Sequence, residues 1–266
     1  MRITVVGCGN LGGPLAELLE ETHEHEVTRA DKNPMLGNPD IGAASENADM
    51  VFVVVPTPSN EDGTYDISIL HSALDEIEPG PIVVIVSTVL PGDCAALKAA
   101  TGHTICYSPE FVRLGHVKAD MRNPDFVLIG APTHHIGAAV SGVLDSIHLV
   151  LKQTVLLKVI EAELAKIAIN TYLCTKISFA NMIGELAEAL DANAEWVCEA
   201  VGFDHRIGHD YFKPGGAYRG PCLPRDAVAL EALAKSLGLT AELAHAAETI
   251  NKRTTTYLPD DGDRGY

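Results

Sequence analysis

Short aliphatic and β-branched runs recur through the first half of the chain, and segments with apolar residues at helical spacing separate them. We expect strands at Ile3–Val6, Glu26–Ala30, Met50–Val55, Ile82–Ser87, Thr104–Tyr107 and Phe126–Ile129. Helices are expected at Leu11–Glu21, Ser68–Ile77, Cys94–Ala100 and His135–Ile147. This alternation predicts an α/β domain over residues 1–150, in which helices cover both faces of a mostly parallel sheet.

The second half of the chain has a different pattern. Between Glu161 and Leu190 the apolar residues form a broad stripe at helical spacing, interrupted by Gly184 but by no proline. We expect one long central helix there, followed by shorter helices near 194–201, 225–237 and 240–256. Residues 151–257 should therefore form an all-helical domain that packs across a homodimer axis, and 258–266 should form a polar tail.

The segment between the second and third expected strands is short. Residues 32–49 number only 18, whereas a complete crossover with a further strand needs roughly 30 or more residues. The first half of the sheet is therefore expected to be abbreviated.

Composition is that of a soluble globular protein. The 266 residues suffice for one large or two modest domains, and 47% of them are hydrophobic. No apolar run approaches the roughly 20 residues of a membrane-spanning helix, and the N-terminus lacks the layout of a signal peptide. We expect a cytoplasmic protein without membrane contact.

The six cysteines are scattered, with no Cys-x-x-Cys pair and no histidine cluster beside them. This spacing argues against a disulfide framework and against a metal site. Cys106, Cys174 and Cys198 lie among apolar residues and are expected in the core.

The formal net charge is −17, with 36 acidic and 19 basic side chains. A nucleic-acid partner is not expected, because phosphate binding requires clustered lysine and arginine. The anionic surface fits simple solubility or a high-salt source. An anionic cofactor or substrate would need a locally positive site.

A glycine-rich turn follows the first expected strand and opens a helix. Gly7, Gly9 and Gly12 form the pattern Gly-x-Gly-x-x-Gly, in which Asn10 and Leu11 separate the last two glycines. In this context the pattern predicts a Rossmann-type site, where the helix N-terminus faces the pyrophosphate of a dinucleotide.

Asp31 lies at the end of the second expected strand, where it can accept hydrogen bonds from a ribose diol. Its charge would repel a 2′-phosphate, so the expected cofactor is NAD rather than NADP. Arg29 and Lys32 soften that preference.

Cys222 lies in a loop rich in glycine and proline, between Gly215 and Asp226. A hydride acceptor alone oxidises an alcohol to an aldehyde. A thiolate at the same site traps the aldehyde as a thiohemiacetal, whose oxidation gives a hydrolysable thioester. Cys222 and the dinucleotide pattern together suggest oxidation of an alcohol to an acid.

Six stretches occur in order along the chain and resemble the UDP-glucose/GDP-mannose dehydrogenase family. They are Val53–Pro58, Ser87–Gly92, Tyr107–Phe111, Glu163–Asn170, Arg206–Gly208 and Cys222–Asp226. The resemblance implies an NAD-dependent enzyme that oxidises the C6 alcohol of a nucleotide sugar, expected to be a UDP-sugar, to the uronic acid. Two hydride transfers are implied.

Lys166 and Asn170 are four residues apart and share one face of the long helix, where they can stabilise a substrate oxyanion. The resemblance implies that Cys222 is the nucleophile and that Asp226, Glu110 and Thr88 orient water for thioester hydrolysis. Implied cofactor contacts are Pro56, Thr57, Ser87, Thr88 and Arg225, besides the glycine turn. Implied substrate contacts are Glu110, Phe111, Lys166, Asn170, Arg206, Tyr211, Gly215 and Cys222, with Arg206 reaching the sugar of the neighbouring subunit.

The sequence departs from the family at several points, and two of them bear most on the binding of UDP. The family's C-terminal UDP-binding domain is expected to be lacking, and the loop before the cysteine reads Ala-Tyr-Arg-Gly-Pro instead of Gly-Phe-Gly-Gly-Ser. Weaker binding of UDP is therefore expected. Two alternatives stay open: a single-step hydroxyacid dehydrogenase in which Cys222 is idle, and a truncated NAD-binding module without turnover.

Overall fold

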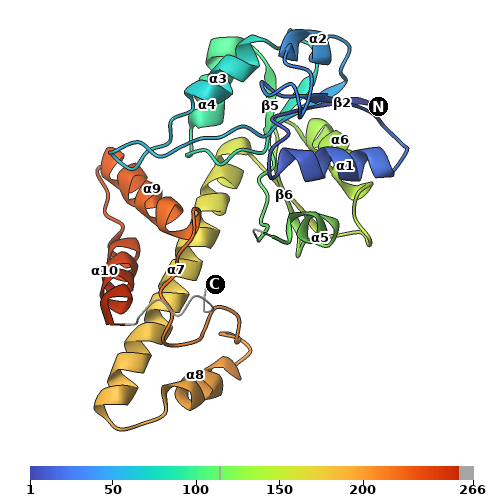
Figure 1. Cartoon of the computed structure of the whole chain (residues 1–266). Helices are drawn as coiled ribbons and strands as arrows, with labels where there is room; N and C mark the ends of the chain where they lie inside the picture. Colours follow the sequence, from blue (N-terminus) through green and yellow to red (C-terminus); the bar gives the residue numbers. More distant parts are fainter. Residues whose placement is uncertain (114, 258–266) are drawn as a thin grey trace. The chain divides into compact units, whose positions relative to one another are not determined.

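The computed structural model describes residues 1–113 and 115–257 (Figure 1). The chain divides into two compact units. The first comprises Met1–Pro58 and Tyr65–Lys166, and the second comprises Ser59–Thr64 and the chain from Ile167 onward. The polar tail expected at 258–266 lies outside the described residues.

The first unit is built on a seven-stranded sheet in the order β2-β1-β3-β4-β5-β6-β7. Its strands are β1 (Arg2–Val6), β2 (Glu26–Ala30), β3 (Met50–Val53), β4 (Ile82–Ile85), β5 (Thr104–Tyr107), β6 (Val127–Gly130) and β7 (Thr154–Leu157). Every neighbouring pair is parallel except β5 and β6, which pair antiparallel at Tyr107 and Gly130. The expected mostly parallel sheet is confirmed, and β7 is an additional strand.

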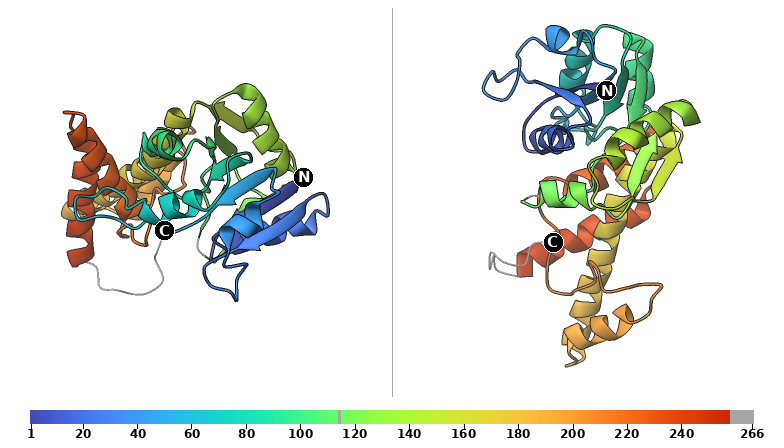
Figure 2. Two further views of the ribbon diagram at one scale, coloured as in Figure 1. Left: turned by 90° about the horizontal axis from the view of Figure 1, so that it is seen from above. Right: turned by 90° about the vertical axis from the view of Figure 1, so that its right-hand side faces the viewer.

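Six helices cover the two faces of this sheet (Figure 2). They are α1 (Gly12–Glu21), α2 (Ile41–Ser45), α3 (Ser68–Asp75), α4 (Asp93–Thr101), α5 (Val117–Arg122) and α6 (His134–Asp145). Apolar residues of α1, α5 and α6 share one core with alternate strand residues such as Phe52. Those of α2, α3 and α4 share the other core, to which Val51 and Val53 contribute. This two-sided burial explains why the central strands are continuously apolar.

The abbreviated edge of the sheet is confirmed. Between β2 and β3 the chain forms only the short helix α2, and β2 is the edge strand. The segment before α2 folds back along the end of β2, where the backbone of Asn38 bonds with Arg29 and Asp31. A Cβ atom at Gly37 would lie 2.9 Å from the Asp31 nitrogen, so only glycine permits this close approach.

Helices make up most of the second unit's described part, and the stretch of residues 203–222 between two of them is a non-helical loop. The long helix α7 (Val159–Ala189) begins in the first unit and continues into the second. It is followed by α8 (Ala194–Gly202), α9 (Leu223–Ser236) and α10 (Glu242–Tyr257). A small core joins α7, α9 and α10 through residues that include Cys174, Ile177 and Ala247. Among the described helices, none has the length and hydropathy to cross a membrane.

Candidate active site

The glycine turn after β1 has the geometry that the sequence pattern predicts. Gly7 has a φ of 87°, and a Cβ atom there would lie 2.4 Å from the Val54 carbonyl oxygen. A Cβ atom at Gly12 would lie 1.9 Å from the Gly7 oxygen. A Cβ atom at Gly9, in contrast, would have no neighbouring atom within 4 Å. The turn is thus closed against the protein and open at Gly9, where a ligand can approach the backbone.

The start of α1, at Asn10, Leu11 and Gly12, can receive an anion. No side chain caps this helix, and its first turn carries no acidic residue. Helix N-termini present N–H groups and a partial positive charge, which together favour phosphate. The pyrophosphate of a dinucleotide therefore fits this end of the helix.

Asp31, the residue after β2, stabilises the same turn through hydrogen bonds. Its carboxylate accepts hydrogen bonds from the backbone N–H of Cys8 at 2.7 Å and of Asn33 at 2.8 Å. A carboxylate has about four acceptor positions, so about two remain for other donors. The two hydroxyls of a ribose match that remaining capacity.

The loops that follow β3, β4 and β5 reach the same edge of the sheet, because these strands are parallel. Ser87 bonds to both the N–H and the carbonyl of Val55, at 2.9 and 2.7 Å. The Thr57 hydroxyl donates to the carbonyl of Thr88 at 2.7 Å. Pro56, beside them, is exposed. Ligands of such sheets bind outside the carboxyl ends of the strands, and these residues lie there.

Lys166 lies against the loop after β5. Its ammonium donates a hydrogen bond to the Glu110 carbonyl at 2.7 Å and lies 4.4 Å from the centre of the Phe111 ring. Desolvation raises the pKa of the half-buried Glu110 carboxyl to about 7, and the charge of Lys166 opposes that shift. A carboxyl that titrates near neutral pH can both accept and donate a proton.

Glu163 is a residue whose role the sequence did not reveal. Its buried carboxylate accepts hydrogen bonds from the N–H groups of Gly92 at 2.8 Å and Cys94 at 2.9 Å. It thereby caps α4 and ties α7 to the loop that carries Ser87 and Thr88. The signal for it was an acidic residue on the apolar face of a helix.

A second set of polar residues lies within the helical unit. Asn170 donates to the Asp226 carboxylate at 2.6 Å, and Arg225 approaches the same carboxylate at 3.4 Å. Asp226 is almost completely buried, in the first turn of α9. Cys222 is the residue that precedes this helix, and its carbonyl accepts the Asp226 N–H at 2.9 Å.

Cys222 differs from the other cysteines, all of which lie in the described part of the chain. It is exposed, whereas the other five are buried. Burial raises the pKa of Cys8 to about 11 and that of Cys106 and Cys174 to about 12, so these remain thiols. The predicted core positions of Cys106, Cys174 and Cys198 are confirmed. Of the six cysteines, Cys222 is therefore the one that a ligand could reach, and it lies at the start of α9.

Two asparagines that the sequence did not single out hold the loop before Cys222. The Asn181 side chain accepts from Gly215 at 2.8 Å and donates to the Gly216 carbonyl at 2.8 Å. The Asn251 side chain bonds to both backbone groups of Tyr218, at 2.8 and 3.1 Å. Both asparagines are buried. The loop conformation therefore depends on α7 and α10.

Arg206 and Tyr211 are two further candidate substrate residues. Arg206 is 78% exposed and pairs with Asp204 at 2.6 Å in the same chain. Tyr211 is half-buried, with a φ of 57°. It packs against the same small core as Leu223, the residue after Cys222.

Comparison with known proteins identifies the family. The model of the family's NAD-binding domain matches residues 35–148, and the model of its central domain matches residues 160–253. The chain belongs to the UDP-glucose/GDP-mannose dehydrogenase family. The cofactor is NAD, and the glycine turn, which precedes the matched residues, supports this by its own geometry.

Individual proteins are similar to this chain over most of its length. UDP-glucose 6-dehydrogenase from Rickettsia conorii is 31% identical over 82% of this chain and 54% of the relative. UDP-glucose 6-dehydrogenase from Bacillus subtilis is 30% identical over 83% of this chain and 50% of the relative. A UDP-glucose dehydrogenase structure from Pyrobaculum islandicum superposes with a TM-score of 0.87, at 28% identity, over 95% of this chain and 68% of that one. The chain spans about half the length of the curated relatives.

Proposed function

We propose that this chain oxidises the C6 alcohol of a nucleotide sugar to the uronic acid with NAD, through a covalent thioester on Cys222. The observation that carries the proposal is Cys222, the one exposed cysteine, placed at the start of α9 one turn from the buried Asp226–Asn170 pair. The named relatives are UDP-glucose 6-dehydrogenases, which supports a UDP-sugar as the substrate.

Two molecules of NAD would supply the hydride acceptors, one for each of the two oxidations. In the first, the C6 hydrogen leaves the sugar as a hydride, the alcohol proton passes to water and the aldehyde forms. The ammonium of Lys166 and the amide of Asn170 lie one turn apart on α7 and stabilise the negative charge on the substrate oxygen. The contact of Lys166 with the Glu110 carbonyl sets the direction of its side chain.

Cys222 acts in the second oxidation. The sulfur bonds to the aldehyde carbon, and the carbonyl oxygen takes up a proton to give a thiohemiacetal. Loss of a second hydride and of the hydroxyl proton leaves a thioester. One water then adds to the thioester carbon, the carbon–sulfur bond breaks, and the uronate and the free thiol are released.

Thioester hydrolysis requires a group that removes a proton from water. The Glu110 carboxyl, whose pKa is raised to about 7, is a competent base when it is ionised. Asp226 orients the water beside Cys222, and Thr88 helps to orient the same water. The Phe111 ring lies beside the Lys166 ammonium. Pro56, Thr57, Ser87 and Arg225 are proposed contacts of the cofactor, and Gly215 of the substrate.

We include a homodimer in the proposal. Large apolar side chains remain exposed along the helical part of the chain, a pattern typical of a subunit interface. They include Tyr172, Phe179, Leu186, Leu190, Trp196 and Phe203. Arg206 and Tyr211 would then serve the sugar of the partner subunit. The six free cysteines fit a reducing, cytoplasmic setting.

The decisive variants are at Cys222. The Cys222→Ser variant should complete the first oxidation but accumulate a covalent sugar ester, because an alkoxide leaves less readily than a thiolate. Intact mass spectrometry after incubation with UDP-glucose and NAD would detect it. The Cys222→Ala variant should release no acid, and the control Cys198→Ala, at a buried position, should still release it. Acid formation by Cys222→Ala at the wild-type rate would instead indicate the hydroxyacid-dehydrogenase alternative.

A further inference from the structure

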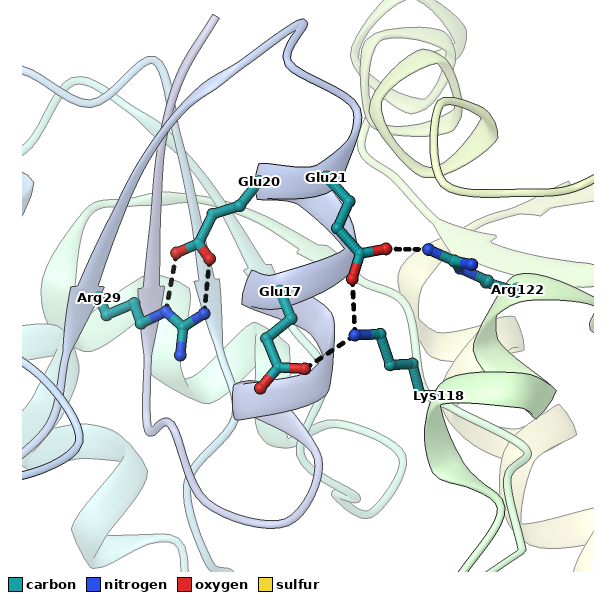
Figure 3. Close-up of polar contacts among 6 residues, drawn as sticks. All are labelled: Glu17, Glu20, Glu21, Arg29, Lys118 and Arg122. Atoms are coloured by element: carbon teal, nitrogen blue, oxygen red, sulfur yellow. Dashed lines mark hydrogen bonds and ion pairs between the residues drawn. The ribbon is translucent and has the colours of Figure 1, made fainter.

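Two cations flank the ribose-binding Asp31, and both are paired with carboxylates. Arg29, two residues before Asp31 in β2, bonds to Glu20 of α1 through two nitrogens, at 2.8 and 2.6 Å. Lys32, the residue after Asp31, bonds to both carboxylate oxygens of Glu76 at 2.6 and 2.9 Å. Figure 3 shows the pair of Arg29 and Glu20.

The position of these cations is the one at which NADP-dependent enzymes carry an arginine for the 2′-phosphate. Arg29 lies in β2, and Asp31 directly follows Ala30, the last residue of that strand. The charges of Arg29, Asp31 and Glu20 all act on the Cys8 thiol in the glycine turn. Burial is the main cause that raises the pKa of this thiol. The negative charges of Asp31 and Glu20 raise the pKa further, and the positive charge of Arg29 lowers it.

The backbone at this position is fixed. Asp31 donates to the Asn38 carbonyl at 3.0 Å, and Asn38 donates to the Arg29 carbonyl at 2.9 Å. The side chains of Arg29 and Lys32 therefore extend from a backbone whose conformation is fixed by hydrogen bonds. Their partners Glu20 and Glu76 are not required for folding, because ion pairs on an exposed surface contribute about 0–1 kcal/mol to stability.

We propose that Glu20 and Glu76 determine the preference for NAD over NADP by occupying Arg29 and Lys32. With both pairs formed, the five charged groups carry a net charge of about −1, which repels a 2′-phosphate of charge near −2. Without the two carboxylates, the three remaining groups, Asp31, Arg29 and Lys32, carry a net charge of about +1, and the two cations can donate to a 2′-phosphate. The inference rests on the NAD-binding domain and is independent of the proposed oxidation.

Helix α1 offers a matched control. Glu21, one residue after Glu20, points to the other side of the helix and pairs with Lys118 and Arg122 of α5 (Figure 3). A change of Glu21 to glutamine removes the same charge from the same helix. It leaves both cations beside Asp31 paired.

The test uses 5′-AMP and adenosine 2′,5′-bisphosphate, which differ only in the 2′-phosphate, and isothermal titration calorimetry. The Glu20→Gln/Glu76→Gln double variant should bind the bisphosphate about tenfold more tightly than wild type, since each released cation can form charge-assisted bonds. Its affinity for 5′-AMP should stay within about twofold. Glu21→Gln should leave the ratio of the two affinities at the wild-type value.

An unchanged ratio in a double variant that binds 5′-AMP normally would overturn the inference. If the double variant loses 5′-AMP binding, the two single variants decide. A rise in bisphosphate affinity in either one supports the assignment, and no rise in both overturns it.

Discussion

Glu163 connects the long helix to the loop that carries Ser87 and Thr88, and its replacement by glutamine tests how firmly that loop is held. The substitution keeps the size of the side chain but removes its charge. The side chain is 1% exposed, and both its oxygens accept backbone N–H groups, from Gly92 and Cys94.

The magnitude follows from these two bonds. Glutamine can accept one N–H through its oxygen, but its NH2 group then faces the other N–H, which loses its partner. An unsatisfied buried donor costs about 1–3 kcal/mol, and the lost charge at the start of α4 costs about 0.3–1 kcal/mol more. A loss of about 1–4 kcal/mol in the free energy of unfolding is expected. For a chain of this size it lowers Tm by about 3–16 °C.

Thermal unfolding followed by circular dichroism provides the assay. Glu161→Gln is the control, because Glu161 is exposed on the same helix. Its carboxylate accepts the Lys158 N–H at 2.9 Å and lies 3.8 Å from the Lys158 ammonium. The control should lower Tm by no more than about 2 °C. Equal Tm values for the two variants would refute the assignment of Glu163 as the buried cap of α4.

Two further predictions concern the cofactor and the assembly. Asp31→Ala should weaken NAD binding and narrow its advantage over NADP in titration calorimetry, because it removes the proposed ribose acceptor and one negative charge; unchanged affinities for both would exclude Asp31 as that acceptor. Light scattering at micromolar concentration should give the mass of a dimer, and a monomer would contradict the proposed interface.

Strong local patterns predicted most of the fold. The parallel strands, the helices α1, α3, α4 and α6, and the long helix each had a clear period, and the short 32–49 segment correctly predicted an abbreviated sheet. The strand β7 was missed because its four residues are only half-buried and follow polar residues. The short α5 was missed because its sequence, Val-Lys-Ala-Asp-Met-Arg, has little apolar periodicity.

The candidate site was predictable where a motif constrains the backbone. Gly7 and Gly12 are required by close contacts with neighbouring backbone, and such contacts leave a glycine pattern in the sequence. Asn181 and Asn251 could not be found in this way. Their partners are backbone groups at least 33 residues distant in the sequence, and any buried amide on a helix looks the same from sequence alone.

One substrate molecule is proposed to undergo two oxidations, the second of them as an adduct of the Cys222 thiol. The most direct measurement is the ratio of NADH formed to uronate released, across a panel of UDP-sugars, GDP-sugars and free sugars. Two NADH per uronate are expected with at least one nucleotide sugar, and no acid is expected from the free sugars. One NADH per substrate, with the aldehyde or ketone as the product, would contradict it.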